Sequence, residues 1–116
     1  MNLRIEKIRL KDLESFVQSE TFQQFTTIPI TVLRAKSYLN NPHSKPDDLV
    51  LYLGFVEKQL VAFRTLFADS IFSENEPIRF AWCSGNWVHT DFRRKGFSEK
   101  LLQEAFTDWN GTNLPN

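Results

Sequence analysis

The residues best suited to chemistry in this sequence are three consecutive cations, Arg93, Arg94 and Lys95, with Gly96 directly after them. An apolar run that ends at Trp87-Val88 precedes them, and a segment with helical spacing follows. Free backbone N–H groups and the helix dipole favour an anion where a helix begins, and glycine lets a ligand approach the backbone. The pattern therefore predicts a phosphate-binding turn; a solvated basic turn is the alternative.

Several elements must position this turn. Alternating apolar residues predict a strand over residues 3–8. Helical spacing predicts a helix from Leu10 that fades near Glu20, and a second helix that Thr31 caps and that ends before Asn41. Apolar runs predict strands over 49–56, 60–67 and 78–88, with a bulge at Gly85-Asn86, and a last helix from the turn to Trp109.

The stretch Arg93-Arg94-Lys95-Gly96-Phe97-Ser98 resembles the hallmark of the GNAT-superfamily N-acetyltransferases, Gln/Arg-x-x-Gly-x-Gly/Ala, which joins the fourth strand to the third helix of that family. The order of elements agrees along the whole chain. Ser98 departs from the pattern, because the family has glycine or alanine there. Serine is small enough to be tolerated, although it could slightly hinder the approach of a phosphate.

The resemblance implies an α/β (α+β) fold with a mixed, mostly antiparallel, twisted sheet flanked by helices, in the order β-α-α-β-β-β-α. It implies acetyl-CoA as cosubstrate, no metal, and transfer of the acetyl group to a primary amine of an unidentified acceptor by direct attack. The backbone of the strand would pair with the pantetheine arm, and the N–H groups of the turn would face the pyrophosphate. The cofactor-binding residues implied are Trp87, Val88, Arg93, Arg94, Lys95, Gly96, Phe97 and Ser98.

The family continues beyond this helix with further strands and a helix. We therefore expect residues 1–116 to form a single acyl-CoA-binding domain that lacks the C-terminal strands of the fold and belongs to a longer protein. A homodimer in which two copies complete the sheet is the alternative.

No catalytic residue can be assigned from the sequence, because residues 78–88 carry no carboxylate of the kind that many relatives use as general base. His89 ends this strand, but a surface histidine needs no function, and Cys83 is expected to pack in the core. Two other classes of function stay open: a non-catalytic CoA-binding or regulatory module, and a protein-interaction domain.

The composition narrows the class of partner. Fourteen basic and fourteen acidic side chains cancel, so no global field attracts nucleic acid or an anionic membrane. No stretch approaches the roughly 20 apolar residues of a membrane span. A single cysteine forms no intrachain disulfide, and we expect a cytoplasmic protein.

Overall fold

The computed structural model describes residues 2–111 and 113–115. The strands are β1 (Arg4–Arg9), β2 (Leu49–Val56), β3 (Gln59–Ser73), β4 (Glu76–Val88) and β5 (Asn113–Pro115). The helices are α1 (Leu10–Val17), α2 (Glu20–Gln23), α3 (Val32–Leu39) and α4 (Phe97–Asp108), and a short 3-10 turn, η1 (Thr90–Phe92), precedes α4. The predicted order of the longer elements is confirmed. Within the described residues no helix is long and apolar enough to cross a bilayer.

The five strands form one sheet in sequence order, β1-β2-β3-β4-β5. Neighbouring strands are antiparallel from β1 to β4, and β5 pairs in parallel with residues 81–83 of β4. The strand β5 was not predicted from the sequence, which indicated no strand after α4. Three residues that include a proline carry too little pattern to predict a strand.

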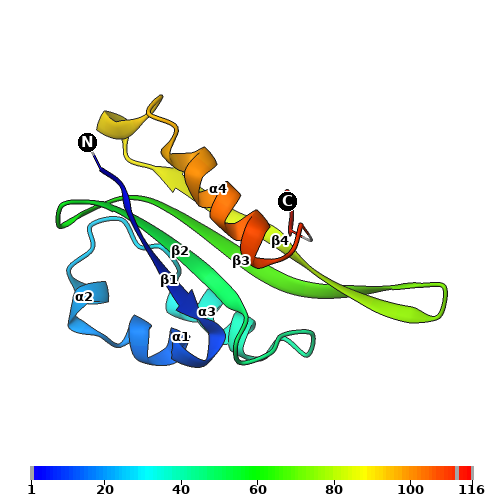
Figure 1. The fold of residues 1–116 in the computed structure, drawn as a ribbon. Coiled ribbons are helices and arrows are strands. Elements are labelled where there is room, and N and C mark those ends of the chain that lie inside the picture. The colour runs from blue at the N-terminus through cyan, green and yellow to red at the C-terminus, as the bar shows by residue number, and fades with distance from the viewer. Residues whose placement is uncertain (1, 112, 116) are drawn as a thin grey trace.

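Helices cover both faces of the sheet, which gives the chain two cores (Figure 1). On one face α1, α2 and α3 pack over side chains such as Val50, Leu53 and Phe63. On the other face α4 packs through Phe97, Leu101 and Ala105. Leu101 has no exposed surface, whereas its neighbour Leu102 is 36% exposed.

Side-chain caps explain where the helices of the first face begin. The hydroxyl of Thr31 accepts a hydrogen bond from the Arg34 N–H at 3.1 Å, so the predicted cap of α3 is confirmed. The hydroxyl of Ser19 accepts from the Phe22 N–H at 3.2 Å and starts α2. The helix predicted from Leu10 to near Glu20 corresponds to α1, which ends at Val17, whereas α2 was not predicted.

Strands β3 and β4 extend further than the sequence predicted and form a long ribbon that projects from the sheet (Figure 1). Only Glu74 and Asn75 make the turn, and both have positive φ, 52° and 70°. A two-residue turn with positive φ at both positions matches the twist of the strands that it joins.

A polar network fixes the C-terminal half of α4 to the sheet. Tyr52, which is fully buried, donates a hydrogen bond to Asp108 at 2.9 Å. Lys7 pairs with Asp108 and with Glu104, each at 2.9 Å. The hydrogen bond to Asp108 raises the pKa of Lys7, while burial and the same carboxylate raise the pKa of Tyr52. The network therefore joins a charged Lys7 and a protonated Tyr52 to the carboxylate of Asp108.

We expect Leu101→Ala to lower the free energy of unfolding by about 2–5 kcal/mol, because it leaves a cavity between α4 and the sheet. Leu102→Ala is the matched control on the same helix and should cost less than half as much. Urea unfolding followed by tryptophan fluorescence measures both. Equal losses would contradict this packing of α4.

Candidate functional site

The site begins at an irregularity in β4. Thr65 of β3 lies opposite Gly85, but the next residue, Leu66, lies opposite Cys83, so Ser84 has no partner of its own. This is a β-bulge, which bends the strand and redirects its edge. The bulge predicted at Gly85-Asn86 is thus confirmed, one residue earlier in the chain.

A polar cluster supports the bulge from the side of α3. The guanidinium of Arg34 donates to the Tyr38 hydroxyl at 3.1 Å, to Thr65 Oγ1 at 3.3 Å and to the Ser84 carbonyl at 3.4 Å. The hydroxyl of Tyr38 also hydrogen-bonds Ser84 Oγ. A Cβ on Gly85 would lie 2.6 Å from Thr65 Oγ1, so glycine is required for this close approach.

Beyond the bulge, the outer edge of β4 is open. β5 pairs only with residues 81–83, so on this outer edge residues 84–88 have no strand beside them within the described residues. The His89 N–H donates to the Val61 carbonyl of β3 at 2.7 Å. Because backbone groups alternate in direction along a strand, those of Asn86 and Val88 point to the open edge. This edge can accept an added extended chain.

The turn after β4 has the geometry of an uncapped helix start. His89 Nδ1 accepts from the Asp91 N–H at 3.1 Å, and Arg93 Nε donates to the Val88 carbonyl at 3.3 Å. Arg94 and Gly96 both have positive φ, 65° and 78°. Gly96 is the N-cap and offers no side-chain hydrogen bond, so the first N–H groups of α4 are available to a ligand.

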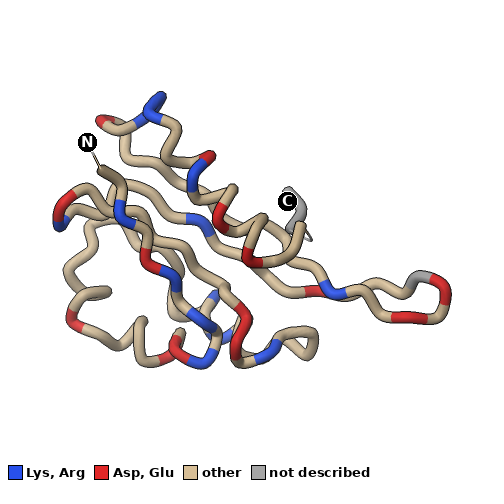
Figure 2. Tube along the Cα trace, viewed as in Figure 1, with Lys and Arg blue, Asp and Glu red and all other residues tan. Residues whose placement is uncertain are grey.

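A cavity of about 320 Å³ opens at this turn. Of the eight residues that the sequence indicated, six line it; the lining is Val88, Phe92, Arg93, Arg94, Gly96, Phe97, Ser98 and Glu99. Arg93, Arg94 and Lys95 are exposed, and among the described residues none of them pairs with a carboxylate. Figure 2 shows this basic run at the end of the molecule where α4 begins.

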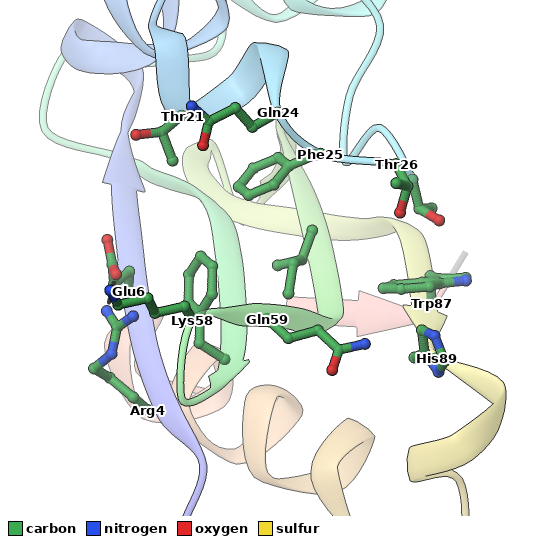
Figure 3. Close-up of a pocket in the computed structure, with 13 residues that line it drawn as sticks. Arg4, Glu6, Thr21, Gln24, Phe25, Thr26, Lys58, Gln59, Trp87 and His89 are labelled. Carbon is green, nitrogen blue, oxygen red and sulfur yellow. Dashed lines mark hydrogen bonds and ion pairs between the residues drawn. The ribbon is translucent and has the colours of Figure 1, made fainter.

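Trp87 and Lys95 do not line this cavity. The side chain of Lys95 is exposed to solvent and lies next to two residues that do line the cavity, Arg94 and Gly96. The ring of Trp87 lies on the opposite face of the sheet, stacked on Phe63 with 5.4 Å between ring centroids. There Trp87 and His89 line a second cavity of about 540 Å³, and Figure 3 shows them facing Arg4 and Glu6 across it.

Three polar residues that the sequence analysis did not assign to the site also lie at the turn or bulge. Arg64 interrupts the apolar run of β3 and is 8% exposed; its guanidinium donates to Ser98 Oγ at 2.9 Å. Asn86 lies opposite Arg64 on β4 and was assigned only to the bulge. Arg34 lies within the helix predicted after Thr31 and was given no role. Of these three residues only Arg64 could have been noticed in the sequence, because it is a lone arginine within an apolar strand.

The surroundings of the residues that could act as a base or a nucleophile do not assign a catalytic role to any of them. Because His89 Nδ1 accepts a hydrogen bond, the neutral ring carries its proton on Nε2 and presents a donor to the second cavity. Cys83 packs against the core beneath α4. Glu74 and Glu76 lie at the exposed end of the β3–β4 ribbon. None of these positions assigns a general base.

We expect Gly85→Ala to destabilise the protein by about 1–3 kcal/mol, because the new methyl group overlaps Thr65 Oγ1. Thr65→Ala removes that atom, so the double variant should be more stable than the two single losses predict when added, by about 1 kcal/mol. Urea unfolding of the four proteins gives this coupling. Strict additivity would contradict the close contact at the bulge.

Comparison with known proteins places this geometry in context. No family model matches the sequence, and no curated protein matches it. Several solved structures do match the fold of this chain. An aminoglycoside acetyltransferase from an uncultured soil metagenomic sample, in complex with trehalose, superposes with a TM-score of 0.59 at 16% identity, over 98% of this chain and 76% of that one.

Two further structures agree. AAC(6')-Iy, in complex with the bisubstrate analog CoA-S-monomethyl-acetylneamine, gives a TM-score of 0.60 at 10% identity, over 100% of this chain and 80% of that one. A GNAT family acetyltransferase from Staphylococcus aureus gives 0.56 at 16% identity, over 100% and 87%. At these identities the likeness concerns the fold. The sheet and the helices of this chain thus have the fold of the acetyltransferases to which these structures belong.

Proposed function

We propose that this protein is an N-acetyltransferase that moves an acetyl group from acetyl-CoA to a primary amine. One observation carries the proposal: the open edge of β4 leads directly into an uncapped helix start with three cations that no carboxylate of the described residues neutralises. An extended arm and a diphosphate, joined as they are in CoA, match these two features in the same order.

The residues of the turn divide the work of binding. The N–H groups of Phe97 and Ser98 at the start of α4 point at the diphosphate, and Arg93, Arg94 and Lys95 supply positive charge around it. The backbone of Val88 and its neighbours on the β4 edge pairs with the pantetheine arm. The indole of Trp87 lies on the other face of the sheet and the backbone groups of this residue point to β3, so the arm pairs with the backbone of Asn86 and Val88 and not with that of Trp87.

The reaction needs no intermediate that is covalently bound to the protein. The amine attacks the thioester carbonyl, the carbonyl oxygen gains negative charge, and the tetrahedral species breaks its C–S bond. The leaving CoA thiolate takes up the proton that the amine loses, so the products are the amide and the free thiol. Backbone N–H groups beyond the bulge at Ser84 polarise the carbonyl, and catalysis rests on orientation and on this stabilisation. The cavity beside Trp87 and His89 is the proposed space for the acceptor, because these two residues adjoin the open edge of β4 at which the thioester would lie.

A second candidate function is a CoA-binding module without turnover. It is favoured by one observation: among the described residues of β4 beyond the bulge no side chain is a carboxylate, so no residue of that strand deprotonates the amine there. Both functions require CoA binding. They differ in whether free thiol appears when acetyl-CoA and an amine are supplied together.

We expect calorimetric titration to detect binding of acetyl-CoA and Gly96→Val to weaken it at least about tenfold, because a β-branched residue at φ 78° disturbs the helix start. Gly96→Asn is the matched control, since asparagine tolerates positive φ and has open space there. It should keep the melting temperature near that of the wild type and bind with intermediate affinity. Wild-type affinity in Gly96→Val would contradict the phosphate site.

Arg94 provides a test in which stability and binding change in opposite directions. A non-glycine residue at φ 65° costs about 1–2 kcal/mol, so Arg94→Gly should keep or raise the free energy of unfolding while weakening acetyl-CoA binding a few-fold. Lys95→Gly removes one cation from the same turn without relieving a positive φ, so this variant should lose both stability and affinity for acetyl-CoA. Urea unfolding and titration at two salt concentrations measure the pair; parallel behaviour of the two variants would contradict the assignment.

Turnover separates the two candidate functions. We expect free CoA thiol to accumulate, in a colorimetric thiol assay, when the protein is given acetyl-CoA with members of a panel of primary amines that includes aminoglycosides. The rate should rise with pH as more amine is unprotonated. Binding of acetyl-CoA with no thiol release from any amine would support the module without turnover.

A further inference from the structure

A buried cation lies beneath the start of α4. Arg64 is 8% exposed, its Nε is buried without a hydrogen-bond partner, and none of the described carboxylates pairs with it. Its Nη2 reaches Ser98 Oγ at 2.9 Å and the Ser98 carbonyl at 3.4 Å. A guanidinium beside the positive end of a helix is unfavourable by itself, so its retention indicates a role in the site.

Arg64 determines the direction of the next hydrogen bond. A guanidinium only donates, so the Ser98 hydroxyl accepts from it and directs its own hydrogen to Asn86 Oδ1 at 3.2 Å. The amide oxygen of Asn86 is thereby occupied. The Nδ2 group, with its two donors, is left without a hydrogen bond on an exposed side chain at the open edge of β4.

We infer that the Asn86 side chain is a cofactor contact, whose Nδ2 donates to an amide carbonyl of the pantetheine arm, and that Ser98 and Arg64 are its positioning residues. The inference rests on the proposed function. Asn86 lies two residues before Val88, about 7 Å further along β4 from the turn. That places it beside the arm when the diphosphate occupies the start of α4.

The same network assigns a structural role to the hydroxyl of Ser98. In the sequence analysis its hydroxyl was a departure from the family pattern that could crowd a phosphate. In the structure the hydroxyl is engaged with Arg64 and Asn86, while the Ser98 N–H remains at the cavity. The serine therefore adds an orienting group without occupying the space of the anion.

The test compares Asn86→Ala with the wild type, using acetyl-CoA and, separately, adenosine 3′-phosphate 5′-diphosphate, which has the diphosphate but no arm. We expect about a two- to tenfold loss of affinity for acetyl-CoA and no loss for the nucleotide, because one hydrogen bond to the arm is removed. Asn40→Ala, an exposed asparagine at the end of α3, is the matched control and should bind both as the wild type does.

A double-mutant cycle tests the positioning role of Ser98. Ser98→Ala should weaken acetyl-CoA binding in the wild type but have little effect in the Asn86→Ala background, because Ser98 acts through Asn86. In a ¹⁵N–¹H spectrum, the side-chain amide pair that Asn86→Ala removes should shift when acetyl-CoA is added. Ser98→Ala should shift the same pair without ligand.

The outcomes are distinct. If wild-type protein binds acetyl-CoA while Asn86→Ala binds it equally well, the contact is wrong and the proposed function stands. Equal losses for acetyl-CoA and the nucleotide overturn the assignment to the arm, and additive effects in the cycle overturn the positioning role. If wild-type protein binds neither ligand, the proposed function and this inference fail together.

Discussion

The unequal pairing of β4 is the constraint on which the rest of the site depends. On its inner edge β4 pairs with β3 along its whole length, from Glu76 to Val88, whereas on its outer edge β5 pairs with only three residues. The strand is therefore rigid on one side and open on the other. The bulge at Ser84 marks the change, since the open stretch begins where the register shifts. Rigidity and an exposed edge in one strand are what an added chain requires.

The supports of this strand come from both faces. On one face, Arg34 and Tyr38 of α3 hold the bulge through hydrogen bonds that only a glycine at position 85 permits. On the other face, Arg64 reaches across β4 to the first turn of α4. Each contact joins residues distant in sequence, so the helices and the strand order each other. A site assembled in this way is organised before any ligand arrives.

Much of this could be predicted from local patterns. The glycine after three cations, the apolar run before it and the helical spacing after it all concern neighbouring residues, and they located the turn, Gly96 and α4. Arg64 and Arg34 could not be assigned, because their roles depend on contacts 34 and 50 residues away in the chain, with Ser98 and the Ser84 carbonyl. Ser19 was missed as a cap for a different reason: α2 has only four residues, too few to show a helical pattern of its own after a helix that is predicted to fade near Glu20.

The alternation of side chains along the last residues of β4 has a consequence for how such a protein can diversify. Val88 faces α4 and the basic turn, whereas Trp87 and His89 face the separate cavity between α2 and the β2–β3 hairpin. Trp87 and Val88 can therefore be substituted with separate effects on the two cavities, whereas His89 also contacts the turn through Phe92 and the Asp91 N–H. Variation at Trp87 can therefore reshape the cavity that it lines while the basic turn at the other cavity stays constant.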